Sequence, residues 1–151
     1  MNIFSKKILS KEDLGILAAE IAGMELTTSG ELRVVIRHHR HFTEWRRAIH
    51  EIALSEFRRL GMHHTRDHTG VLIFLLVSER RFHIIADEGI HAKVADGTWD
   101  AVAAGMSAHF RQGNFRQGIS EAIAAVGTVL AREFPRTEGK GNELPDDVIE
   151  E

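Results

Sequence analysis

The chain has 151 residues, of which 43% are hydrophobic, and a formal net charge of −3 at pH 7. This length fits one domain, which buries roughly two thirds of the surface that its unfolded chain would expose. There is no cysteine, which excludes disulfides, thiolate metal centres, iron–sulfur clusters and cysteine nucleophiles.

Charge and hydropathy also limit the partners. Residues 136–151 carry a net −4, which leaves the body, residues 1–135, at +1. A near-neutral body lacks the basic excess that binding to a phosphate backbone requires, so we expect no nucleic-acid partner. No segment approaches the roughly 20 apolar residues that span a bilayer, and the first 15 residues do not resemble a secretion signal. We therefore expect a soluble, cytoplasmic protein with no membrane partner.

The first elements predicted along the chain are a helix, a strand and a helix. Ser10 and Asp13 resemble a capping box, and apolar residues then recur at helical spacing over 11–25. Residues 31–39 alternate in the manner of a strand with one wetter face. Thr43 is a plausible N-cap for a long second helix that ends near Gly61 and has Trp45 on its apolar stripe.

A histidine-rich loop, residues 61–69, comes directly before the most hydrophobic run in the chain, residues 70–77. That run is apolar at every position after Gly70 and is short for a helix, so it predicts a central strand covered on both faces. Four polar residues then lead into 82–87, and so short a connection favours an antiparallel hairpin.

Two further helices complete the predicted domain, residues 1–135. Asp96 can cap the third, which has Trp99 on its apolar face, and the fourth runs from Phe115 until Pro135 stops it. Residues 136–151 have few apolar residues and many charges, which predicts a largely disordered acidic tail. The apolar residues within this tail could dock on a partner or fold back over the domain, or the tail could simply solubilise the chain.

These elements predict an α/β fold, a three-layer α/β/α sandwich with a small mixed sheet, because a strand buried on both faces needs helices on both sides. If the first two strands are parallel, residues 37–41 and 78–81 meet at one rim of the sheet. The loop 61–69 then lies at the opposite rim, where it faces residues 86–90.

Several separated motifs resemble the TPM domain family. They are "TTSGELRVVI", "EFRRLGMHHTRDHTGVLIFLLVSERRFHIIADEGI", a tryptophan early in the next helix, "HFRQGNFRQGI", and "FP" followed by "NELPDD". The resemblance covers residues 10 to 150 and is closest to the soluble, cytoplasmic bacterial branch in which the domain stands alone. It implies an α/β/α fold and a range of roles in relatives: divalent cation binding, often of calcium, acid phosphatase activity of the thylakoid type, photosystem repair, and accessory functions at receptors.

The chain departs from this family in two ways. Many members carry an export signal or membrane helix, and this sequence shows neither, so thylakoid and receptor roles do not transfer. Before the central strand, relatives commonly read Asp-Asn-Gly or Arg-Asn-Gly, whereas this chain has His68-Thr69-Gly70. The acidic ligand moves one place back, to Asp67, which puts a calcium site like that of the relatives in doubt.

The candidate metal ligands form two chemical sets. Asp67, Asp87 and Glu88 offer oxygen ligands to Ca²⁺ or Mg²⁺, and Glu31 lies at the same rim. The alternatives are an ordinary charged turn, in which Gly89 supplies a positive φ, and a strand-edge charge at Glu31.

His63 and His68, with Asp67 nearby, suit zinc, nickel or copper instead. Their spacing matches no zinc signature, so these side chains could equally be solvated loop histidines.

The function that follows is a divalent-cation-binding or protein-interaction module, expected to be a monomer with a protein partner. The alternative is a metal-dependent acid phosphatase, for which the sequence shows no phosphate-binding glycine-rich loop and identifies no catalytic residue. Its cofactor would also be calcium or magnesium.

Overall fold

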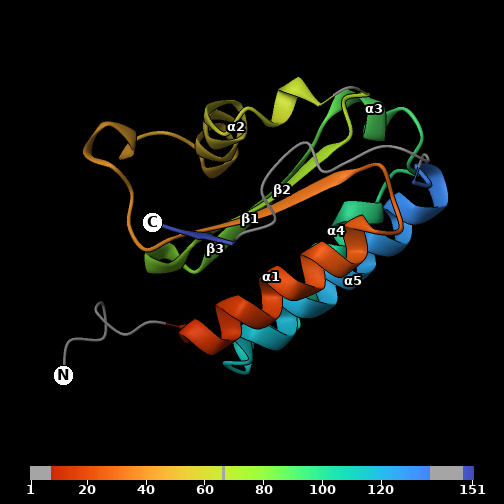
Figure 1. Cartoon of the computed structure of the whole chain (residues 1–151). Coiled ribbons are helices and arrows are strands. Elements are labelled where there is room, and N and C mark those ends of the chain that lie inside the picture. The colour runs from red at the N-terminus through yellow and green to blue at the C-terminus, as the bar shows by residue number, and fades with distance from the viewer. Residues whose placement is uncertain (1–7, 66, 137–147) are drawn as a thin grey trace.

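The structure is a computed structural model, which describes residues 8–65, 67–136 and 148–151. Its α-helices are α1 (Lys11–Glu25), α2 (Ile49–Arg59), α3 (Glu88–His91), α4 (Thr98–Arg111) and α5 (Phe115–Glu133), and its 3₁₀ turns are η2 (Phe42–Glu44), η3 (Met62–His64) and η4 (Val77–Glu79). Its strands are β1 (Glu31–Arg37), β2 (Gly70–Leu76), β3 (Arg81–Ala86) and β4 (Ile149–Glu150) (Figure 1).

Among the described residues, the strands form one mixed sheet in the order β3-β2-β1-β4. β1 and β2 are parallel, with Glu31 opposite Gly70, and β2 and β3 form an antiparallel hairpin. The β-α-β unit and the hairpin predicted from the sequence are both confirmed.

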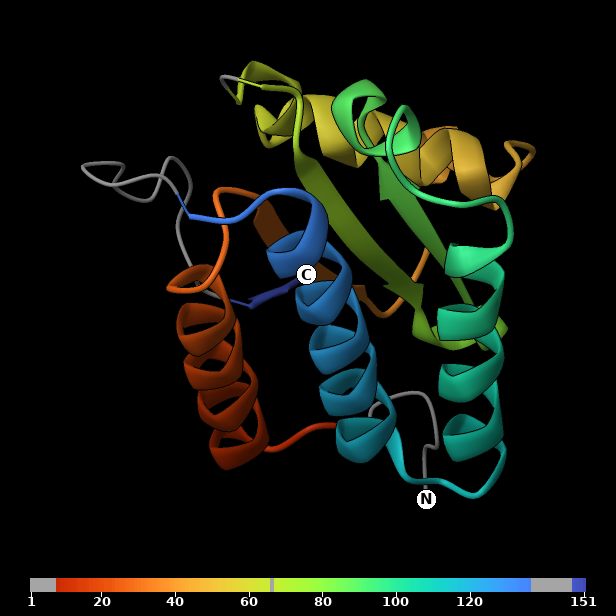
Figure 2. The ribbon, with the colours of Figure 1, turned by 90° about the vertical axis from the view of Figure 1, so that its right-hand side faces the viewer.

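Two apolar clusters lie on opposite faces of the sheet. α2 covers one face, and α1, α4 and α5 form a layer on the other (Figures 1 and 2). All seven residues of β2 are buried, as its continuous apolar sequence predicts for a strand with helices on both sides. The three-layer α/β/α sandwich with a small mixed sheet is therefore confirmed.

Local sequence signals explain where the first helix begins. The Ser10 hydroxyl accepts a hydrogen bond from the Asp13 N–H at 3.0 Å, and the Asp13 carboxylate accepts one from the Ser10 N–H at 2.9 Å. This reciprocal capping box supplies acceptors for N–H groups that the helix itself leaves without partners. The start of α1 at Lys11 is where the sequence predicts it.

The second helix is shorter than predicted. The chain forms the 3₁₀ turn η2, and α2 begins only at Ile49. The Arg40 guanidinium donates to the carbonyl oxygens of Glu44 at 2.7 Å and of Arg47 at 2.6 Å. These bonds hold the segment in an irregular loop, in which Trp45 is 64% exposed, and not on a core-facing helical stripe.

One other expectation is wrong. β1 has no wetter face, because α2 covers its polar side and all seven of its residues are buried. Within the tail that the sequence predicts to be largely disordered, Ile149 and Glu150 form β4 beside Val35 and Ile36 of β1. The rest of the predicted tail, residues 137–147, lies outside the described residues. None of the helices in the described part of the chain is long and apolar enough to cross a membrane.

His83 on β3 gives the fold a pH dependence that can be measured. Burial lowers the pKa of His83, and the nearby His50, whose ring centre is 6.1 Å away, lowers it further. The unfolded chain therefore binds a proton at this position more readily than the folded chain does. We expect the urea midpoint to fall as the pH drops below about 6.5, the ordinary histidine value.

The variant that tests this is His83→Gln. It should lower the slope of the unfolding free energy against pH by an amount equivalent to up to one proton. His39→Gln, at an exposed histidine, is the control for removing a histidine. An unchanged slope in His83→Gln would contradict the assignment to this residue.

Candidate functional site

The loop 61–69 and the start of α3 meet at one end of the sheet, which we call the loop rim. The Glu31 N–H donates to the Thr69 carbonyl at 3.1 Å, which ties the start of β1 to the loop. The Gly89 N–H donates to the His68 carbonyl at 3.0 Å, which ties α3 to it. The predicted meeting of residues 61–69 with 86–90 is therefore confirmed.

Asp87 is the most enclosed carboxylate on α3's side of the loop rim. Its Oδ1 accepts a hydrogen bond from the Glu88 N–H at 2.8 Å, which caps α3. Its Oδ2 lies 3.5 Å from Nδ1 of His68 and has no hydrogen-bond partner among the described residues. The side chain is 12% exposed. A buried carboxylate oxygen without a donor is costly, and a cation would offset that cost.

Gly89 lies where two backbone carbonyl oxygens approach its Cα too closely for a side chain. The positive φ suggested for it from the sequence is wrong, because the positive-φ glycines of the described residues are Gly61, Gly97 and Gly113. A Cβ built on Gly89 would collide with the carbonyl oxygen of Asp67 and would lie 2.7 Å from that of His68. Two backbone carbonyl oxygens therefore converge on the start of α3. Carbonyl oxygens of this kind are common ligands of calcium.

Glu31, Gly70 and Asp87 form one row across the sheet. Glu31 is opposite Gly70 in the ladder, and the Asp87 N–H donates to the Gly70 carbonyl at 3.0 Å. Because side chains alternate along a strand, Glu31 lies on the face that α2 covers. The ring of Phe57, from α2, lies 3.5 Å from where a Cβ of Gly70 would be. The Met62 carbonyl oxygen lies 2.9 Å from where a Cβ of Gly70 would be, so a third backbone oxygen faces this row.

The six predicted ligands do not form one cluster of side chains. Asp67, Glu88 and His68 are exposed on the flanking turns, whereas Glu31 is only 3% exposed. The ring of His63 packs against that of His64, with centres 3.8 Å apart. Within the described ranges, no group of three or more His, Asp or Glu side chains is placed to hold a metal ion. Any cation at this rim must therefore take much of its coordination from backbone oxygens and water.

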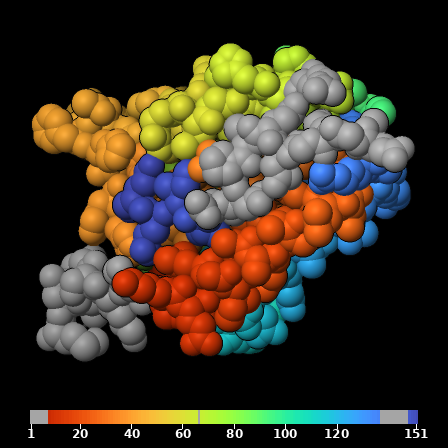
Figure 3. Space-filling view, in the orientation of Figure 1, coloured from red at the N-terminus to blue at the C-terminus, as the bar shows by residue number. Residues whose placement is uncertain are grey.

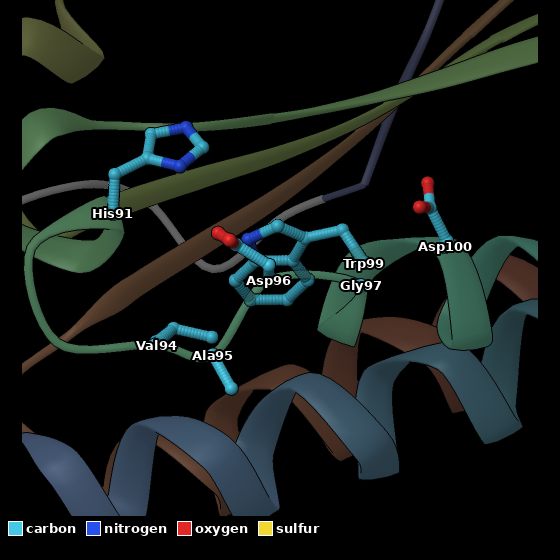
Figure 4. A pocket seen from close by; sticks show the side chains of 7 residues that line it. All are labelled: His91, Val94, Ala95, Asp96, Gly97, Trp99 and Asp100. Carbon is cyan, nitrogen blue, oxygen red and sulfur yellow. The ribbon is translucent and has the colours of Figure 1, made fainter.

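A small hollow lies on the other side of α3, between His91 and the start of α4. It measures about 150 Å³, and its wall includes His91, Asp96, Trp99 and Asp100 (Figure 4). The indole Nε1 of Trp99 is buried and has no hydrogen-bond partner among the described residues. Pockets for organic ligands usually measure about 300–1,000 Å³, so this hollow does not provide a site for a large substrate.

The opposite rim holds a charge network that sequence reasoning missed. Arg37, only 1% exposed, contacts Glu44 and Glu56, and Arg40 contacts Glu79. Burial alone would raise the pKa of Glu44, but the His41 N–H and the Arg37 guanidinium outweigh it and hold that pKa below its usual range. The Arg40 guanidinium likewise lowers the pKa of Glu79. The sequence signal that could have indicated this network is Arg37, a charged residue at the end of the buried strand β1.

Comparison with known proteins agrees with this architecture. No curated protein matches the sequence. The solved structure of the BA42 protein from the psychrophilic bacterium Bizionia argentinensis shares 31% identity and a TM-score of 0.87, over 97% of this chain and 98% of that one.

Two more distant structures share the fold. The N-terminal domain of a protein from P. gingivalis has 22% identity and a TM-score of 0.66, over 84% of this chain and 79% of that one. The N-terminal domain of the cg2496 protein from Corynebacterium glutamicum has 14% identity and a TM-score of 0.60, over 89% and 78%. Residues 3–129 match the TPM domain, and the chain therefore belongs to the TPM domain family.

Proposed function

We propose that the chain is a divalent-cation-binding module, which holds calcium or magnesium at the loop rim with Asp87 as its central ligand. The observation that carries this proposal is the buried Oδ2 of Asp87, which has no hydrogen-bond donor among the described residues. A hard cation satisfies such an oxygen without requiring a further protein donor.

The surrounding groups suit calcium better than a transition metal. The carbonyl oxygens of Asp67 and His68 converge beside Gly89, and the carboxylates of Asp67 and Glu88 are exposed on the adjoining turns. Calcium accepts six to eight oxygen ligands in variable geometry, including backbone carbonyls and water. The imidazoles of His63 and His68 are the ligands that zinc, nickel or copper would use instead.

A bound cation would also have a structural effect. It would neutralise Asp87 and join the loop 61–69 to α3, which already meet through the Gly89–His68 hydrogen bond. We propose that this ordered rim is what a protein partner recognises. The cytoplasmic location and the monomeric state expected from the sequence stay predictions.

The test is the melting temperature of the metal-free protein with and without calcium or magnesium. A cation that binds only the folded state stabilises it by mass action, by about 2.7 kcal/mol at a concentration one hundred times the Kd. We expect Asp87→Asn to remove most of this shift, whereas Asp100→Asn, an acid in the first turn of α4, retains it.

The same titration separates the alternatives. No shift at millimolar calcium or magnesium in the parent chain rules out the cation site. A shift with zinc or nickel alone, lost in His68→Asn, assigns the rim to a transition metal. Metal-dependent phosphate release from a phosphoester, abolished by Asp67→Asn or Asp87→Asn, would instead support the acid phosphatase alternative.

A further inference from the structure

The outer edge of β1 is occupied by residues 148–151, which we call the acidic strand. Ile149 lies opposite Val35 and Glu150 opposite Ile36 in a parallel ladder. The Glu151 N–H donates to the Ile36 carbonyl at 2.7 Å, and the His38 N–H donates to the Glu151 carbonyl at 3.1 Å. An edge strand offers unpaired backbone groups to any extended segment, and here the chain itself supplies that segment.

Two apolar side chains of the acidic strand fit on opposite faces of the sheet. Val148 packs against the cluster beneath α1, α4 and α5, and Ile149 packs against the cluster beneath α2. Figure 3 shows residues 148–151, in dark blue, lying between the surfaces of α1 and α2. This alternation is how strand addition obtains specificity, because pockets on either side of the edge read alternate side chains.

Two basic side chains meet the acids that follow. Nε2 of His38 lies 3.1 Å from Oε2 of Glu150, and the Arg59 guanidinium contacts the carboxylate of Glu151. Arg59 is also held in place by Glu56, with Nη2 and Oε2 2.6 Å apart. The β1 edge therefore presents backbone hydrogen-bonding groups, two apolar contact sites and two basic groups in a fixed order.

We propose that the β1 edge, with His38 and Arg59, is a binding site for an extended peptide of another protein, in which two aliphatic residues precede two acidic ones. The acidic strand occupies this site in cis, and such a peptide binds by replacing it. The site is at the opposite end of β1 from the loop rim, so it does not depend on the proposed cation site.

The short ladder explains how replacement can occur. In the described residues, β4 pairs only with Val35 and Ile36 of the seven-residue strand β1. A tethered segment competes at an effective concentration of about a millimolar, so a partner must gain more than the acidic strand provides. A peptide that pairs with further residues of β1 gains additional backbone hydrogen bonds.

The main experiment uses the full chain with a weakened acidic strand, Ile149→Ser together with Glu151→Gln, and a fluorescent peptide of the parent sequence 145–151. Anisotropy should show saturable binding of one peptide per chain, at least about tenfold tighter than binding to the parent chain, whose site is occupied. A peptide carrying Ile149→Ser should bind about tenfold more weakly, because it loses the apolar contact beneath α2.

Charge recognition is tested on α2, where Arg58 and Arg59 are adjacent and both exposed. Added to the weakened chain, Arg59→Gln should lower the affinity for the peptide by up to about fivefold, and its effect should shrink at high salt. Arg58→Gln, for which no contact with the acidic strand is observed, should leave the affinity unchanged. Equal effects of the two substitutions would overturn the role of Arg59.

A second measurement keeps the test valid if the weakened chain does not fold. Unlabelled peptide at millimolar concentration should shift the amide resonances of Ile149 and Glu151 in the isotope-labelled parent chain, because it displaces them from β1, and leave that of Gly89 in place. No shift in the parent chain, or no binding to a folded weakened chain, overturns the proposal. A dimer of the parent chain that the weakened strand abolishes would assign the edge to a second copy and overturn the assignment to another protein.

Discussion

Arg37→Met should be the most damaging single substitution in the sheet, with an expected loss of about 3–5 kcal/mol in the free energy of unfolding at pH 7. The Arg37 side chain is 1% exposed, and it contacts Glu44 and Glu56, whose side chains are 9% and 5% exposed. Methionine fills a similar volume but leaves both carboxylates enclosed without this cation. Urea unfolding of the parent and variant chains measures the difference.

The loss should depend on pH in a defined direction. The pKa of Glu44 lies below its usual range in the folded chain, so its stabilising contribution is present above the unfolded value, about 4.3, and is lost as the pH falls through the folded value. Arg37→Met should therefore cost less at pH 4 than at pH 7. In the variant, protonation of the Glu44 carboxylate relieves its repulsion with the enclosed Glu56.

A surface ion pair provides the matched control. Arg132 and Glu133 lie 3.1 Å apart, and the arginine is 63% exposed. Arg132→Met should cost less than about 1 kcal/mol, because solvent screens exposed pairs. If Arg37→Met costs no more than Arg132→Met, the buried network does not stabilise the fold.

The sequence predicted those parts of the fold that depend on periodicity. The central strand, the hairpin and the helices α1 and α5 follow from repeating apolar positions, and from these the parallel pairing of β1 with β2 could be inferred. The start of α2 could not, because Arg40 binds the carbonyls of Glu44 and Arg47. A side chain that binds carbonyls of a later turn leaves no trace in the hydrophobic pattern.

β4 was not predicted from the sequence, for a related reason. It has two residues, and its partners in β1 and α2 are about 90 residues or more away in the sequence. No local pattern of that length distinguishes a strand from an acidic tail. The sequence of the tail shows only its composition, and a composition rich in charged residues indicates disorder.

At the loop rim, too, the sequence predicted the arrangement of the segments but not the contacts of individual side chains. Topology alone placed residues 61–69 against 86–90, and the His68–Asp87 contact at 3.5 Å confirms that placement. The individual ligands depend on side-chain and carbonyl orientation, which strand order does not determine. The role of Gly89 was misread because a glycine needed for close approach and one needed for positive φ look identical in sequence.

Gly89→Ala should distinguish these two roles and test how firmly the loop packs on α3. The added Cβ would collide with the Asp67 carbonyl oxygen and crowd that of His68. These are backbone atoms, so the loop itself must move, and the Gly89–His68 hydrogen bond is strained with it. We expect a loss of about 1–3 kcal/mol in the free energy of unfolding.

Gly105→Ala is the matched control, because a Cβ at this exposed position inside α4 meets nothing within 4 Å. It should stabilise the chain by about 0.5–1 kcal/mol through helix propensity, so the two substitutions should have opposite signs in urea unfolding. Gly89→Ala should also reduce the calcium-induced melting shift, because it displaces the carbonyls of Asp67 and His68, whereas Gly105→Ala should not. A stabilised Gly89→Ala with an unchanged calcium response would show that the loop and α3 do not form one rigid cradle.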